Sequence, residues 1–309
     1  MLCGAGTLAL PTFASNGYPS RPIRLIVPYP PGGGIDAVAR VYAEQLSRVL
    51  DQSIVVDNRP GAATNIGIAA AAKSDPDGYT LCIASTGLVN NQHFGPKPSY
   101  DTFRDLAPIG LLSSMPFMIA ASPASGIPDM RTLLERARAA PNTISIGSSL
   151  RTQVEITTHL ARIELLKVYY KGGAQAVVDA VAGQIDLVFG LYSVLMENAR
   201  AGKLKLIAVA DAQRSSLAPD VPTFAEAGIP GYPQPSWAAV MAPAGTPQPV
   251  RDRLEAATRQ VTENPEFVSF LSAQGIEVTY RSAPQLAQML REQSDESAAL
   301  FKELGSVVG

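Results

Sequence analysis

Residues 24–40 read RLIVPYPPGGGIDAVAR, and this stretch decides the fold class. A β-branched apolar run leads into a proline-rich bend and three consecutive glycines, and apolar residues recur at helical spacing from Ile35 onward. The pattern predicts a strand, a glycine loop and the N-terminus of a helix. Because first-turn N–H groups lack helical partners and the helix dipole is positive there, such a loop can bind an anion. A plain strand-to-helix turn, with Asp36 at the helix start, explains the same residues equally well.

The residues around the glycines favour a carboxylate over a phosphate. A phosphate-binding P-loop needs Lys and then Ser or Thr after its glycines, whereas Ile35 and Asp36 follow here. The dinucleotide fingerprint spaces its glycines as Gly-x-Gly-x-x-Gly, whereas these are contiguous. Asp36 would also repel a polyphosphate. A singly charged group held by backbone N–H is therefore the expected ligand group.

Composition excludes several classes of protein. The chain has 309 residues, which is enough for two lobes with sizeable cores. Its net charge of −2 offers no basic surface for nucleic acid or an anionic membrane. His93 and His159 are the only histidines, and no His/Cys cluster has metal-ligand spacing. We therefore expect no metal, no other cofactor and no nucleic-acid partner.

The first residues have the character of an export signal. Residues 1–20 carry no charge, residues 2–13 are apolar or small, and Thr12, Phe13 and Ala14 form a fair signal-peptidase site. This predicts a residual signal peptide over 1–14, too short to span a membrane, and an exported protein. The mature chain keeps one cysteine, Cys82, so we expect no intrachain disulfide.

Short apolar runs alternate with amphipathic stretches along the chain, which predicts an α/β protein with parallel sheets and helices on both faces. The expected strands are 23–28, 53–57, 79–84, 107–112, 117–121, 143–147, 165–169, 185–189, 204–210, 237–242 and 276–280. The expected helices are 35–50, 64–73, 129–140, 152–163, 173–182, 193–201, 222–227, 247–262, 265–273 and 284–304.

Ligands of such sheets bind beyond the carboxyl ends of the strands. Small polar residues and glycines follow four expected strands, at 30–36, 85–87, 147–149 and 171–173, and tyrosines near strand ends could form walls. These stretches predict a site for a small polar molecule.

An enzyme is the poorer interpretation. Ser85 or Ser148 as a nucleophile would need a base, and only His93 and His159 could be a histidine base. No Gly-x-Ser-x-Gly elbow is present, and no pair of carboxylates stands out for acid–base work. We therefore expect no catalytic residues.

The chain resembles the solute-binding receptors of tripartite tricarboxylate transporters, the Bug family. Nine motifs in the same order carry the resemblance: residues 22–28 with 31–36, 55–62, 65–67, 75–81, 170–173, 183–186, 201–204, 219–223 and 242–247. Each motif is weak alone, but together they cover nearly the whole mature chain.

The resemblance implies a two-lobed periplasmic binding protein, type II-like, with two crossover strands. Lobe one would hold residues 21–119 and 241–309, and lobe two residues 120–240. The ligand would be a small carboxylate, such as a dicarboxylate, an acidic amino acid or an aromatic acid. A monomer would deliver it to transporter membrane subunits in the periplasm. The alternative is a periplasmic sensor that presents its ligand to a two-component sensor kinase.

Candidate ligand-binding residues follow from the strand ends and the resemblance. They are Tyr29, Pro31, Gly32, Gly33, Gly34, Asp36, Ser85, Thr86, Gly87, Ser148, Ser149, Arg151, Thr152, Gln153, Tyr170 and Tyr192. Asp36 is expected to contact the ligand or a water.

This sequence departs from the family pattern at three places by the site. Ile35 replaces a threonine, residues 148–152 read SSLRT in place of a loop rich in Gly and Asn, and residues 190–192 read GLY where Asp-Asn is frequent. The ligand of any one relative therefore cannot be carried over. Arg151 either binds a second carboxylate of the ligand, or faces solvent or pairs with Glu155.

Overall fold

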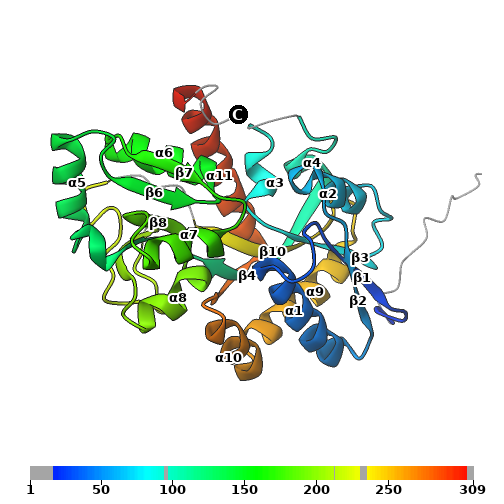
Figure 1. Cartoon of the computed structure of the whole chain (residues 1–309). Helices are drawn as coiled ribbons and strands as arrows, with labels where there is room; N and C mark the ends of the chain where they lie inside the picture. Colours follow the sequence, from blue (N-terminus) through cyan, green and yellow to red (C-terminus); the bar gives the residue numbers. More distant parts are fainter. Residues whose placement is uncertain (1–16, 94–96, 212, 230–234, 305–309) are drawn as a thin grey trace, which may run out of the picture.

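The computed structural model describes residues 17–93, 97–211, 213–229 and 235–304 and contains two β-sheets flanked by helices (Figure 1). The expected signal peptide, 1–14, lies outside the described residues. Within the described part of the chain, no helix is both long and apolar enough to cross a membrane.

Sheet A has six strands in the order β11-β4-β10-β3-β1-β2. Their bounds are β1 (Ile23–Val27), β2 (Ile54–Asn58), β3 (Thr80–Ala84), β4 (Leu106–Met115), β10 (Ser236–Pro243) and β11 (Glu277–Ser282). Sheet B has five strands in the order β7-β6-β8-β5-β9. Their bounds are β5 (Phe117–Ala121), β6 (Ser145–Ser148), β7 (Leu166–Tyr169), β8 (Leu187–Leu191) and β9 (Lys205–Ala210).

Both sheets are mixed, so the expectation of parallel sheets was wrong in part. β1 pairs in parallel with β2 and β3, and β6 pairs in parallel with β7 and β8. In contrast, β10 is antiparallel to β3 and β4, and β5 is antiparallel to β8 and β9. β5 and β10 are the strands by which the chain enters the other sheet, and a strand that arrives from the other sheet is not bound by the strand–helix–strand crossover rule. β11 is antiparallel to β4 as well, although the chain stays in sheet A between β10 and β11.

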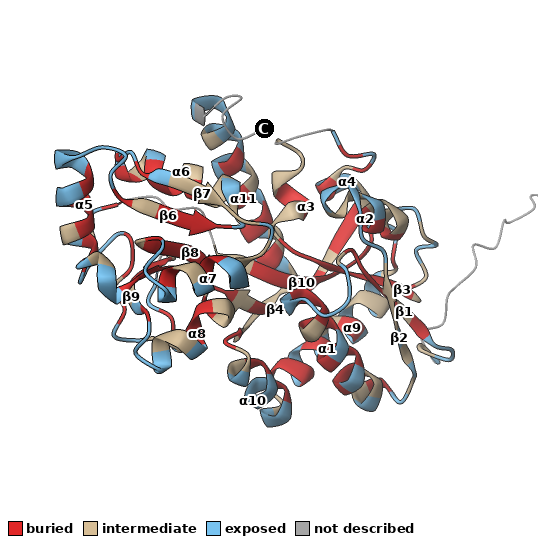
Figure 2. Ribbon diagram, in the orientation of Figure 1, coloured by how far each residue is buried: buried red, intermediate tan, exposed pale blue. Residues whose placement is uncertain are grey.

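Helices cover both faces of each sheet, as expected (Figure 1). On sheet A, α1 (Gly34–Leu50), α9 (Gln248–Thr262) and α10 (Pro265–Ala273) pack on one face, and α2 (Asn65–Ala72), α3 (Gly87–Asn90) and α11 (Ala283–Leu304) on the other. On sheet B, α5 (Met130–Ala139) and α6 (Arg151–Ala161) oppose α7 (Gly173–Val181) and α8 (Tyr192–Arg200). Figure 2 shows buried residues along the strands and on the inner sides of the helices.

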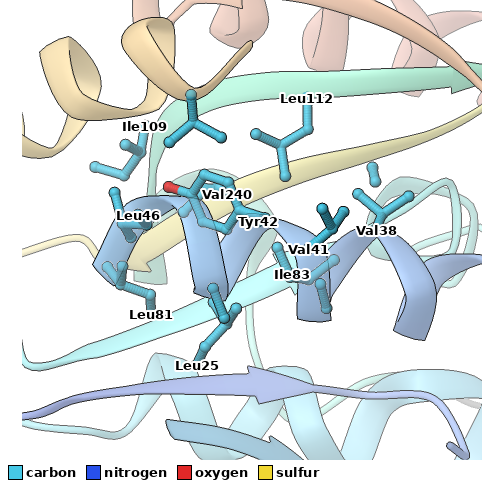
Figure 3. Close-up of a cluster of buried hydrophobic side chains, with 14 of the residues drawn as sticks. Leu25, Val38, Val41, Tyr42, Leu46, Leu81, Ile83, Ile109, Leu112 and Val240 are labelled. Carbon is cyan, nitrogen blue, oxygen red and sulfur yellow. The ribbon is translucent and has the colours of Figure 1, made fainter. Parts of the chain in front are cut away.

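Helix α1 shows why the apolar spacing specifies this packing. Val38, Tyr42 and Leu46 are fully buried and lie on the same side of the helix, where they meet Leu25 and Ile83 of the sheet (Figure 3). The Tyr42 hydroxyl is 2.7 Å from the Thr258 hydroxyl of α9, which satisfies its polar end in the core. This packing fixes the start of α1 against the end of β1.

The chain changes sheets at two places. Only Pro116 separates β4 from β5, and the chain returns to sheet A ahead of Ser236, where β10 begins. The expected lobe boundaries, after 119 and after 240, therefore fall inside β5 and β10, because an apolar run does not show which sheet it joins. We propose residues 17–115 with 236–304 as lobe one, and 117–229 as lobe two.

The expected helix over 222–227 is wrong. Its residues form turns, and Thr223 makes an isolated bridge to Val209 at the end of β9. Thr223 and Glu226 also hydrogen-bond each other through backbone and side chain, which closes a single turn. In a stretch of only six residues, the spacing of apolar residues does not distinguish a helix from such a turn. The sequence analysis also missed α3 and α4 (Thr102–Asp105), which have four residues each.

Candidate ligand-binding site

The glycine loop joins β1 to α1 and leaves donors free. Residues 30–34 are exposed, and Gly32 has φ of 88°, a left-handed conformation that favours glycine. The first helical hydrogen bond runs from Ala37 N–H to the Gly33 carbonyl at 2.9 Å. The described residues give no hydrogen-bond acceptor to the preceding N–H groups, those of Gly34, Ile35 and Asp36. A carboxylate could accept hydrogen bonds from them.

Asp36 holds this loop from inside. Its carboxylate accepts hydrogen bonds from Gly32 N–H at 2.9 Å, from Arg40 Nε at 2.8 Å and from Asn58 Nδ2 at 2.8 Å, and the residue is only 2% exposed. Burial alone would raise its pKa, but these three donors hold the pKa of Asp36 below its usual value. These contacts direct the carboxylate into its own loop, where it positions the glycines. The expected contact of Asp36 with the ligand or a water stays a prediction.

The second loop of lobe one follows β3 and contacts the first. Ser85 is buried, and its hydroxyl lies 3.4 Å from that of Ser236, where β10 begins. Burial raises the pKa of Tyr29 to about 12, although a hydrogen bond with Ser85 lowers it. Thr86 and Gly87 are half-buried at the start of α3. The structure thus brings Tyr29, Ser85 and the glycine loop together at one end of sheet A.

The lobe-two loop follows β6. Ser148 is fully buried, and its hydroxyl accepts a hydrogen bond from Leu150 N–H at 2.9 Å, so this side chain shapes the turn. Ser149 is exposed, and Thr152 and Gln153 are half-buried in the first turn of α6. Ser149, Thr152 and Gln153, together with the exposed Arg151, are therefore the reachable polar groups of this loop.

Arg151 does not pair with Glu155. Its guanidinium carbon lies 4.3 Å from the centre of the Tyr169 ring, a cation–π geometry. The two carboxylate oxygens of Glu155 instead bond to Lys167 Nζ at 2.5 Å and to the Tyr169 hydroxyl at 2.6 Å. Tyr169, the last residue of β7, therefore orients the Arg151 side chain.

The tyrosines expected near the strand ends of lobe two differ in their surroundings. Tyr170 adjoins the lobe-two loop, since its N–H donates to the Ser148 carbonyl at 2.9 Å. The Tyr170 hydroxyl donates to Asp179 of α7 at 2.7 Å, and burial together with that carboxylate raises the pKa of Tyr170 to about 12. Tyr192 is 3% exposed in the core beneath α7 and α8, and its hydroxyl donates to the Leu217 carbonyl at 3.2 Å. Tyr192 is a core residue in this structure, because a tyrosine at a strand end can point inward as readily as outward. Its expected contact with the ligand stays a prediction.

A strained turn that the sequence did not predict lies beside the second loop. Gly61, Ala62, Ala63 and Thr64 all have positive φ, between 45° and 128°. Asn91 holds the turn, because its side-chain amide donates to the Ala63 carbonyl at 2.6 Å. Non-glycine residues in this conformation cost energy and concentrate at functional sites. Two alanines give no sequence signal for positive φ, so only the motif at 55–62 could have pointed to this turn.

The lobes also touch beside the glycine loop. At Gly275, after α10, an added Cβ would lie 3.0 Å from Ser193 Cα at the start of α8. The Glu277 carboxylate accepts hydrogen bonds from Ser216 N–H at 3.1 Å and from the Ser216 hydroxyl. No group of three or more His, Cys, Asp or Glu among the described side chains could hold a metal ion.

Two mixed α/β lobes, joined by two crossovers and carrying glycine- and serine-rich loops at their strand ends, define a solute-binding protein. The chain belongs to the tripartite tricarboxylate transporter receptor family, whose model matches residues 38–306. Curated relatives include a protein encoded in the tcbD–tcbE intergenic region of a Pseudomonas species, 35% identical over 93% of this chain and 88% of its own. Protein BugT of Bordetella pertussis is 31% identical over 97% of this chain and 94% of its own.

Solved structures of the same family superpose over most of the chain. The periplasmic binding protein BugD is 30% identical, with a TM-score of 0.75 over 93% of this chain and 99% of its own. MatC from Rhodopseudomonas palustris with bound malate is 26% identical, with a TM-score of 0.75 over 94% of this chain and 100% of its own. An R. palustris protein with adipate is 28% identical, with a TM-score of 0.76 over 94% and 98%.

Proposed function

We propose that this protein is a periplasmic receptor that captures a small organic carboxylate between its lobes and delivers it to the membrane subunits of a tripartite tricarboxylate transporter. The observation that carries the proposal is the start of α1. Its free N–H groups stand behind an exposed glycine loop, and the neighbouring Asp36 and Arg40 neutralise each other at 2.8 Å. A single carboxylate satisfies those donors without a charged side chain.

Two further observations support binding without catalysis. Relatives of the same family hold malate and adipate, both small dicarboxylates. The histidine side chains contact α11 and not a serine of the binding loops: His93 lies 2.9 Å from Ser294, and His159 lies 3.4 Å from Glu303. Among the described residues, neither Ser85 nor Ser148 is therefore paired with a histidine base.

A thermal-shift screen of carboxylates tests the proposal and identifies the ligand. At a hundred times its dissociation constant, a ligand stabilises a protein by about 2.7 kcal/mol, which shifts the melting temperature by a few degrees. Malate and adipate belong in the screen, beside amino acids, sugars and phosphate as other classes. Stabilisation by a sugar or an amine, and by no carboxylate, would refute the proposal.

Ligand is expected to draw the two lobes together. The carboxylate-binding groups of the proposal lie on loops of both sheets, so a ligand that contacts both favours the closed arrangement. Small-angle X-ray scattering with a saturating carboxylate should give a smaller radius of gyration than the free protein. Buffer with matched ionic strength is the control, and superimposable profiles would show a receptor that is already closed without ligand.

A further inference from the structure

Lobe two presents a cation at its ligand-binding edge. Arg151 begins α6, directly after the loop that follows β6, and is exposed. Among the described residues its guanidinium has no hydrogen-bond acceptor and no ion pair. Since guanidinium carries five N–H donors in a planar fork, it is ready for bidentate recognition of a carboxylate.

The neighbours of Arg151 orient it without cancelling its charge. The Tyr169 ring lies beneath the guanidinium, and Glu155 fixes that tyrosine by accepting its hydroxyl at 2.6 Å. Glu155 is itself paired with Lys167 at 2.5 Å, and both side chains are largely buried. The four residues carry two cations and one anion, so one positive charge is left over.

The position of this charge is locally unfavourable. Arg151 occupies the first position of α6, where the helix dipole is already positive, and a cation there costs stability. The described contacts offset that cost through the ring stack and through the attraction of the Glu155 carboxylate, whose pKa Arg151 helps to lower. In lobe one, by contrast, Asp36 pairs with Arg40, so only neutral N–H donors remain at the start of α1.

We infer that Arg151 selects ligands with a second carboxylate, which it binds from lobe two while the first carboxylate lies on the α1 N-terminus of lobe one. The inference rests on the proposed function and narrows it from carboxylates to dicarboxylates. Arg151 is then the specificity-determining residue, and Tyr169 is a positioning residue that holds its side chain.

Matched ligand pairs of equal chain length test this directly. We would titrate succinate against butanoate, glutarate against pentanoate and adipate against hexanoate by calorimetry. The wild type is expected to bind the dicarboxylate of the best pair about tenfold to a hundredfold more tightly. Arg151→Gln should remove most of that preference and leave the affinity for the monocarboxylate nearly unchanged. Arg151→Lys should retain part of it, since lysine keeps the charge but not the planar fork.

Two further variants separate recognition from charge and from folding. Arg131→Gln removes the same charge from α5, far from the strand ends of lobe two (Figure 1), and should leave the preference intact. Tyr169→Leu keeps the Arg151 charge but removes the ring beneath it, so the preference should fall, whereas Tyr169→Phe should preserve the stack and most of the preference. Melting temperatures show that each variant is folded.

The outcomes distinguish the inference from the proposed function. If Arg151→Gln weakens both members of a pair equally, or neither, Arg151 does not read a second carboxylate, and carboxylate capture still stands. A wild type that prefers the monocarboxylates also overturns the inference alone. If the wild type binds neither monocarboxylates nor dicarboxylates, both the proposed function and the inference are refuted.

Discussion

A Gly33→Val variant is expected to fold like the wild type and to bind its carboxylate at least about a hundredfold more weakly. Gly33 has φ of −86° and ψ of 170°, an extended conformation open to valine, and no atom lies within 4 Å of an added Cβ. The new side chain would stand in front of the free N–H groups of α1. Losing two charge-assisted hydrogen bonds of about 1.5–3 kcal/mol each accounts for the expected drop.

The measurement is calorimetric titration with the strongest carboxylate of the screen, beside thermal unfolding of both proteins. Gly33→Ala serves as the graded control, because its single methyl group should produce a smaller loss. A folded Gly33→Val variant that keeps wild-type affinity would remove this loop from the site.

Asp36→Asn is expected to cost about 1–3 kcal/mol of stability at neutral pH. Three donors surround the carboxylate, from Gly32, Arg40 and Asn58. An asparagine side chain must turn its NH2 group toward at least one of them, so a donor faces a donor in a nearly buried site. Affinity should also fall, because Asp36 holds Gly32 in place.

Acid removes the same contribution in the wild type. The pKa of Asp36 is lowered by folding, so its stabilisation is complete above the ordinary value of 3.8 and is lost as pH falls through the lowered folded value. The difference in unfolding free energy between wild type and Asp36→Asn should therefore shrink below about pH 3.8. Urea unfolding between pH 3 and pH 7 measures it.

Asp252→Asn is the matched control, because Asp252 is exposed on α9 and, among the described residues, accepts a hydrogen bond only from Gln248. Its stability should change little. An Asp36→Asn variant as stable as wild type but unable to bind would restore Asp36 as a direct ligand contact.

Local patterns predicted most elements of the fold. All eleven strands in the described part of the chain were expected from apolar runs. β3 and β5 are buried at every position, as strands covered on both faces must be. Strand direction could not be read the same way. β5 and β10 are antiparallel to both neighbours because the chain enters each from the other sheet. An apolar run predicts a strand but not the direction in which the strand runs relative to its neighbours.

For the candidate site, too, some features could be predicted from the sequence and others could not. Backbone features were predictable, since consecutive glycines after a strand specify an exposed loop and a helix start. Side-chain orientation was not. Asp36 turns inward to three donors, of which two are four residues away in the sequence and the third, Asn58, lies on β2, and Tyr192 enters the core of lobe two. Asp36 and Tyr192 are residue types that often contact ligands, but in this structure their side chains hydrogen-bond within the protein.

The sequence by itself determined the strand–loop–helix units, the family and the glycine loop, because each depends on residues close together in the chain or on motifs in a fixed order. Only the tertiary structure decided the sheet pairing, the contact of Asp36 with Asn58 and the stacking of Arg151 on Tyr169. These depend on residues brought together from separate strands and helices. Which polar groups are satisfied inside the protein, and which are left for a ligand, is settled only when those elements pack.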